Sequence, residues 1–199
     1  MPNWCSNSVT FKHTDLNELQ RLVDAYNDGE TMQTMFPCPC ALRDTTSGFL
    51  GKGTPEQAAL EKQQAENLER YGAKDWFDWC VANWGTKWDF GRKDHHGPAA
   101  EVKTKPDGTH YVELGFDTAW SPPIAFYVHL CDNRGFDIKA YYCEEGVGFC
   151  GVWHNGDDTL FDIREFTQEW LADHIPANIC EAFNLYEQAA EREADNRTT

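Results

Sequence analysis

Hydrophobic positions along the first thirty residues alternate and then repeat with a helical period. Val9 and Phe11 alternate with polar neighbours, which predicts a first strand over residues 5–13. A helix capped by Thr14 follows and ends at Asn27-Asp28-Gly29, because such residues stop helices. Its predicted buried stripe comprises Leu16, Leu19, Leu22, Val23 and Tyr26. The chain therefore begins with a strand and an amphipathic helix.

Residues 30–75 interrupt this pattern and are predicted to be an insertion. Residues 30–53 are dotted with glycine and proline and predict a loop. Thr54 and Pro55 then have the residue types of a helix N-cap and first helical position. The following residues, up to about Tyr71, favour a helix but carry only a weak apolar face, so we expect this helix to be largely exposed.

Residues 75–89 hold four of the eight tryptophans of the chain. They predict a short helix that ends at Gly85 and turns into a strand. The apolar stripe of this helix is predicted to comprise Trp76, Phe77, Cys80, Val81 and Trp84. Two interpretations follow: the aromatic residues form a core seam, or they form a platform for a ligand or partner.

The remaining pattern predicts strands over residues 100–104, 110–120, 136–143, 147–153 and 159–163. Ser121-Pro122-Pro123 opens a helix between the second and third of them, and the last stretch is helical with a break at Pro176. This order predicts an α+β fold: a ferredoxin-like split βαβ antiparallel sheet with helices on one face. We expect one domain over residues 1–199, with a helical insertion at 30–75 and an acidic C-terminal helical extension at 157–199.

The formal net charge of −16 changes the range of expected partners. From Asp157 onward the chain has eleven acidic residues and three arginines, so this extension supplies a net charge of −8, half of the total. Nucleic-acid binding depends on lysine and arginine, so direct binding to nucleic acid is disfavoured. A negative surface instead favours a partner protein with a basic surface.

The eight cysteines are expected to be reduced thiols, because the N-terminus has neither the basic nor the apolar region of an export signal. No apolar run approaches the length of a membrane span. The sequence therefore predicts a cytoplasmic protein without membrane contact.

Candidate catalytic and metal-binding groups do not form a recognisable set. Cys38 and Cys40 are too closely spaced for a typical zinc pair, and His95 and His96 are adjacent in sequence. Glu144 and its neighbour Glu145 are expected to face opposite sides of a strand, and no nucleophile motif is present. We therefore predict no catalytic residue, no metal and no cofactor.

Four segments resemble a known family: residues 1–7, 79–88, 116–123 and 142–146. Together they resemble the YubB-type ferredoxin-like family carried by plasmids and bacteriophages, in collinear order up to about residue 155. The resemblance implies a mobile-element setting and a ferredoxin-like fold. It implies no activity, because the family has no settled biochemical role.

Polar residues near the tryptophans complete a candidate binding site. The predicted site residues are Trp4, Asn7, Asn83, Trp84, Lys87, Trp88, Trp120 and Glu145. Aromatic walls with a few directional polar groups are typical of both small-ligand sites and protein-binding hot spots.

The function predicted from this site is that of a non-enzymatic accessory protein that binds and inhibits a host protein, such as a defence component. The alternative is a nucleotide-like small-molecule binding protein or hydrolase, in which tryptophans stack on a base and Lys87 meets phosphate. Self-association through an open sheet face is a further alternative.

Overall fold

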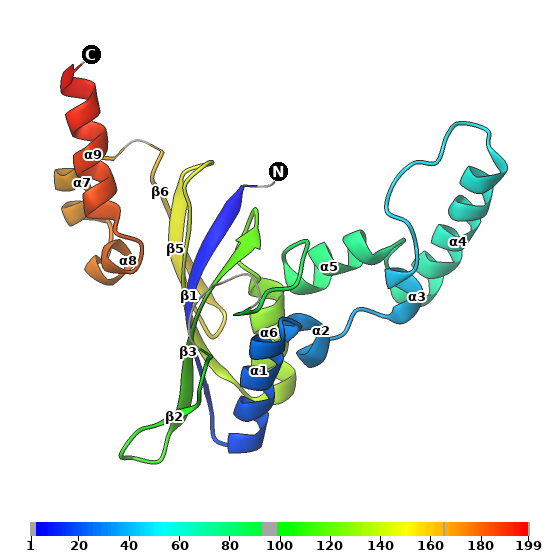
Figure 1. Cartoon of the computed structure of the whole chain (residues 1–199), viewed down its shortest axis with the longest axis horizontal. Coiled ribbons are helices and arrows are strands. Elements are labelled where there is room, and N and C mark those ends of the chain that lie inside the picture. Colours follow the sequence, from blue (N-terminus) through cyan, green and yellow to red (C-terminus); the bar gives the residue numbers. More distant parts are fainter. Residues whose placement is uncertain (1–2, 93–98, 165, 199) are drawn as a thin grey trace.

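A six-stranded antiparallel sheet forms the centre of the computed structural model, which describes residues 3–92, 99–164 and 166–198 (Figure 1). The strand order is β2-β3-β1-β4-β5-β6. The strands are β1 (Trp4–His13), β2 (Lys103–Thr104), β3 (His110–Ala119), β4 (Asp137–Glu144), β5 (Phe149–His154) and β6 (Asp157–Asp162). The α+β, ferredoxin-like class predicted from the sequence is confirmed, although β2 is shorter than the predicted strand over 100–104.

Helices α1 (Leu16–Asp28) and α6 (Ile124–Arg134) cover one face of the sheet, as predicted (Figure 1). Alternate side chains of β1 and β3 point into this core, where Phe11 and Phe116 are almost completely buried. Gly29 and Gly135 end the two helices in the left-handed conformation. The main core therefore follows from the alternating and helical patterns of the chain, with two corrections: Leu16 is 46% exposed, and Asp15, not Thr14, caps α1 by accepting a hydrogen bond from the Asn17 backbone N–H.

The C-terminal extension packs on the opposite face of the sheet (Figure 1). It forms α7 (Gln168–His174), α8 (Ala177–Ala182) and α9 (Leu185–Thr198). A second apolar cluster joins them to β4 and β5 and includes Cys143, Cys150, Ile163, Leu171, Ile175, Ile179, Cys180 and Leu185. Helices thus cover both faces at this end of the sheet, whereas the sequence predicts one covered face. The second face is covered because Cys143 and Cys150 offer apolar side chains there.

The insertion contains α2 (Thr31–Met35), α3 (Cys40–Arg43) and α4 (Pro55–Tyr71). Helix α2 packs beside α1 and adds Met32 and Met35 to the main core, whereas α3 and α4 project away from the sheet (Figure 1). The two short helices replace part of the predicted loop. Thr54 caps α4 as predicted, accepting a hydrogen bond from the Gln57 backbone N–H at 3.2 Å. The buried Asn67 side chain donates to Thr45 Oγ1 at 2.9 Å and holds the loop against α4. Phe49, in the loop between α3 and α4, is 69% exposed.

Helix α5 (Trp76–Trp84) is followed by a loop and not by the predicted strand. Asp89 explains part of this difference, because its carboxylate accepts hydrogen bonds from the backbone N–H groups of Met32 (2.7 Å), Gln33 (2.8 Å) and Phe90 (2.8 Å). The carboxylate therefore caps the first turn of α2 from a distant part of the chain. An extended strand at residues 86–90 would move the Asp89 carboxylate away from the backbone N–H groups of α2.

Asp89 predicts a pH dependence of stability. Burial raises its pKa to about 6, and the three N–H donors offset only part of that effect. The folded protein therefore binds the proton more tightly than the unfolded chain, and this residue makes stability fall as pH rises from about 4 to about 6. For Asp89→Asn, we expect this component to disappear. Denaturant unfolding of both proteins at pH 4, 5, 6 and 7 tests this, and a difference in free energy that does not change with pH would contradict it.

Candidate functional site

Exposed tryptophans gather at one end of the sheet, where β1 begins and β3 ends. Trp4 is 51% exposed, Trp120 is 42% exposed and Trp88 is 38% exposed. The rings of Trp4 and Trp88 lie 6.0 Å apart between centroids, and the ring of Phe77 lies 6.3 Å from that of Trp120. We call Trp4, Phe77, Lys87, Trp88 and Trp120 the tryptophan patch.

Strand pairing and side-chain bonds place these residues together. Trp4 is opposite Ala119 in the β1–β3 register, so Trp4 and Trp120 leave the sheet at the same end. The loop carrying Lys87 and Trp88 is fixed to this end by Thr86, whose hydroxyl donates to the Ala119 carbonyl at 2.9 Å. The patch is therefore built from the ends of two strands, a loop fixed to one of them and, through Phe77, the first turn of α5.

Trp120 has a backbone conformation that is rare for a bulky residue. Its φ is 70°, in the left-handed region that favours glycine. Such a conformation costs of the order of 1–3 kcal/mol and persists only where the surroundings impose it. Here the Trp120 N–H donates to the Asn3 carbonyl at 2.9 Å, and the neighbouring Ser121 hydroxyl donates to the Gly85 carbonyl at 2.8 Å. The fold thus maintains a strained backbone that presents an exposed indole.

Trp120→Gly should leave stability nearly unchanged. Glycine adopts the left-handed conformation without steric cost, and this relief offsets the removal of the packing that a half-exposed indole provides. We expect the free energy of unfolding to change by less than about 1 kcal/mol. Denaturant titration measures this. A decrease of more than about 2 kcal/mol would show that the ring acts as a core residue.

Lys87 lies at the centre of the patch. Its Nζ is 4.4 Å from the ring centroid of Trp88, 5.6 Å from that of Phe77, 5.7 Å from that of Trp120 and 6.0 Å from that of Trp76. All four distances are within the range of cation–π attraction. Within the described residues, no carboxylate forms an ion pair with this ammonium group. The aromatic rings are therefore its main electrostatic partners there.

The other four predicted site residues lie outside the patch. Trp84 is only 4% exposed, and its indole N–H donates to the Phe36 carbonyl at 2.8 Å. Asn7 is 3% exposed, and its amide N–H group donates to the Cys5 carbonyl at 2.8 Å and to the Thr118 hydroxyl at 2.9 Å. Both residues stabilise the fold from inside.

Asn83 and Glu145 also act locally. The Asn83 side chain donates to the Trp79 carbonyl within α5 at 2.9 Å. The exposed Glu145 carboxylate accepts a hydrogen bond from the Gln188 side chain of α9 at 2.8 Å. These bonds place Asn83 in a helix contact and Glu145 beside the C-terminal helices.

Phe77 and Trp76 are aromatic neighbours of Lys87 that the sequence pattern assigns to a buried stripe. In the structure, Cys80 and Trp84 of that stripe are buried as predicted, together with Trp79. Phe77 and Trp76 are only half-buried, and Val81 is 42% exposed. Spacing of Trp76, Trp79, Cys80 and Trp84 at i, i+3, i+4 and i+8 is also helical, and this second stripe is the signal that could have shown the correct face.

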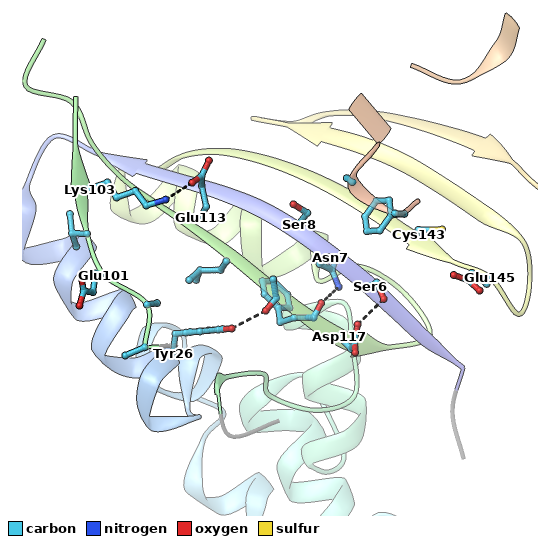
Figure 2. Close-up of a pocket in the computed structure, with 18 residues that line it drawn as sticks. Ser6, Asn7, Ser8, Tyr26, Glu101, Lys103, Glu113, Asp117, Cys143 and Glu145 are labelled. Atoms are coloured by element: carbon cyan, nitrogen blue, oxygen red, sulfur yellow. Dashed lines mark hydrogen bonds and ion pairs between the residues drawn. The ribbon is translucent and has the colours of Figure 1, made fainter. Parts of the chain in front are cut away.

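A groove of about 1110 Å³, lined by polar and apolar residues alike, lies on the outer face of β1 and β3 (Figure 2). Ser6 donates to the Asp117 carboxylate at 2.8 Å, and Lys103 pairs with Glu113 at 2.7 Å. Glu145 lines the groove near the C-terminal helices. The groove contains more carboxylates than cationic groups, so it extends the negative character of the surface away from the patch.

Two features of the described residues bear on metal binding and thiol chemistry. No group of three or more His, Cys, Asp or Glu residues among them could hold a metal ion. Burial raises the pKa of the Cys143 and Cys150 thiols to about 12, which keeps both protonated and weakly nucleophilic. His95 and His96, considered above as metal ligands, lie outside the described residues.

None of the helices described is both long and apolar enough to cross a bilayer.

Comparisons with known proteins agree with this architecture. Residues 99–185 match the profile of a family described as the ferredoxin-like domain in Api92-like protein. An uncharacterized protein of Escherichia coli K12, YubB, is 25% identical over 101 residues, which are 50% of this chain and 63% of that relative. The chain thus matches less than two thirds of the length of this relative.

The crystal structure of protein Api92 from Yersinia pseudotuberculosis aligns with 83% of this chain and 99% of that chain, at 9% identity and a TM-score of 0.37. The family match and the YubB match confirm the resemblance and the ferredoxin-like fold predicted from the sequence. The descriptions of these proteins name no activity.

Proposed function

We propose, from the premise that residues 99–185 are a ferredoxin-like domain of the Api92-like kind, that this chain is a non-enzymatic protein-binding factor. Its tryptophan patch engages a host protein with a basic surface and inhibits it, in the setting of a mobile genetic element. The observation that carries this proposal is the convergence of three half-exposed tryptophans at one end of the sheet.

The clustering of exposed tryptophans in one patch supports a binding role. Trp, Tyr and Arg are the residue types enriched among hot spots of protein interfaces. Single exposed apolar residues are common on protein surfaces, but contiguous aromatic groups mark interaction sites. Trp4, Trp88 and Trp120 are contiguous with Phe77 through ring contacts and through Lys87. Their positions on strand ends and a pinned loop reduce the entropic cost of binding.

The charge of the chain supports a basic partner. With a formal net charge of −16, the protein attracts positively charged surfaces over a distance of about one Debye length, roughly 8–10 Å at physiological salt. Complementary charge mainly accelerates association and adds to specificity. Partner capture should therefore weaken as salt increases.

Capture from bacterial host lysate on the immobilised full chain tests the proposal. We expect one or a few basic proteins to be retained at low salt by the wild-type chain and to be absent with Trp88→Ala. Phe49→Ala is the matched control, because Phe49 is more exposed than Trp88 but lies in the insertion, between α3 and α4. Activity of the retained protein, with and without the chain, tests inhibition.

The proposal is contradicted if Trp88→Ala retains the same proteins as the wild-type chain. It is also contradicted if Phe49→Ala loses these proteins while Trp88→Ala keeps them, or if the wild-type chain retains no protein at any salt concentration. A rise in melting temperature with nucleotides would favour the nucleotide-binding alternative, because a ligand of the folded state stabilises it.

A further inference from the structure

Lys87 is held by aromatic faces from three separate parts of the chain. Phe77 and Trp76 come from the first turn of α5, Trp88 follows Lys87 directly, and Trp120 follows β3. The centroids of their rings lie 4.4–6.0 Å from the ammonium nitrogen. Aromatic groups arranged around one cation are how proteins recognise organic cations, because each ring presents its negative face.

The aromatic cage remains accessible from solvent. Trp88 and Trp120 are exposed by 38% and 42%, and Lys87 is only partly buried. A lysine in such a place gives up part of its hydration without gaining a carboxylate among the described residues. Each cation–π contact at an exposed site is individually weak. Lys87 can therefore leave the cage when a cation with stronger aromatic contacts takes its place.

An arginine side chain is such a cation. Guanidinium is planar, more weakly hydrated than ammonium and able to stack on indole. It is also the cation most often found in protein cation–π pairs. A basic partner, as expected from the net charge of −16, presents such groups on its surface.

We propose that the rings of Trp76, Phe77, Trp88 and Trp120 form a guanidinium-binding cage, which Lys87 occupies in the free protein and an arginine of the partner occupies in the complex. This inference rests on the proposed function and specifies the ligand chemistry of the same site. Lys87 then acts as an internal competitor, whose displacement sets the affinity for the arginine. The strained backbone of Trp120 places one wall of the cage.

The cage is tested on the isolated full chain with small probes, without the partner. The probe is N-acetyl-arginine amide, and the neutral control of the same shape is N-acetyl-citrulline amide. The indole N–H signals of Trp88 and Trp120 in NMR spectra report binding. Lys87→Met removes the charge and keeps the length of the side chain. We expect Lys87→Met to bind the arginine probe at least about tenfold more tightly than the wild type and to discriminate against citrulline, because the competitor is gone.

A second variant keeps this test decisive. Lys87→Met combined with Trp120→Gly should lack the tighter binding, because one wall of the cage is missing. The inference is overturned if Lys87→Met binds the arginine probe no more tightly than wild type, if citrulline binds equally well, or if the double variant binds as tightly as Lys87→Met. Failure of the probes, together with Trp88-dependent capture from lysate, would overturn the cage and leave the proposed function in place. Probe binding without Trp88-dependent capture would overturn the proposed function and with it the role of a partner's arginine, and would leave the cage standing as a guanidinium site.

Discussion

Replacement of both Trp88 and Trp120, as Trp88→Ala with Trp120→Gly, is expected to reduce affinity for the captured partner about 1000-fold. Hot-spot tryptophans cost about 2 kcal/mol or more each when truncated, and about 4 kcal/mol corresponds to three orders of magnitude in Kd. The two rings contact the same cation, Lys87, so their effects need not add fully. Calorimetric titration of the purified partner into each variant measures the reduction.

Stability must be measured in parallel for this double variant. Because Trp88 is exposed by 38% and Trp120 is strained, we expect the free energy of unfolding to fall by no more than about 1–2 kcal/mol. Leu160→Ala on the edge strand β6 is a control for general removal of exposed apolar surface, since Leu160 is 60% exposed. Undiminished affinity in the double variant would remove the patch from the binding surface.

Trp84→Ala should destabilise the fold strongly, in contrast to the double variant of the patch, whose main effect is on partner affinity. Trp84 is buried, its ring contacts Trp79 at 5.7 Å between centroids, and its N–H satisfies the Phe36 carbonyl. Truncation leaves a cavity and an unpaired carbonyl, so we expect the free energy of unfolding to fall by about 3–5 kcal/mol. Denaturant unfolding of the purified variant provides the measurement.

Trp84→Phe separates the two causes. Phenylalanine retains much of the apolar volume but cannot donate a hydrogen bond, so its cost should be clearly smaller than that of alanine. If Trp84→Ala unfolds with the same midpoint and slope as wild type, the assignment of Trp84 to the core is wrong.

The sheet and the two main helices could be predicted because their patterns are local. Alternation around Val9 and Phe11 and the stripe from Leu19 to Tyr26 each indicate one face, and glycine ends the helices. The packing of the C-terminal helices on the second face was harder to predict. Cys143 and Cys150 are directly opposite each other across β4 and β5, and two cysteines in a strand pattern do not by themselves indicate a second apolar cluster.

The loop after Gly85 could not be predicted from local pattern. Its residue types favour a strand, but its conformation depends on partners far away in sequence. Asp89 caps α2 and Thr86 bonds to Ala119. Such side-chain-to-backbone bonds override the local β preference, which is weak and depends on context.

The candidate site was half predictable from the sequence. Trp4, Lys87, Trp88 and Trp120 all lie where a strand or helix ends, and junction residues are often exposed. Trp84 has the same residue type but lies at the end of α5, on its buried face. Residue type and proximity to a junction therefore indicate the neighbourhood of the site, and only the packing of α5 shows which rings reach solvent.

Oxidative footprinting of the tryptophans, on the chain alone and on its complex with the captured partner, tests the central claim most directly. The account predicts that Trp4, Trp88 and Trp120 are modified in the free protein and protected in the complex, whereas Trp84 and Trp153 are unmodified in both states, because both are buried. Protection confined to Phe49 or to other residues, with Trp4, Trp88 and Trp120 equally modified in both states, would contradict it.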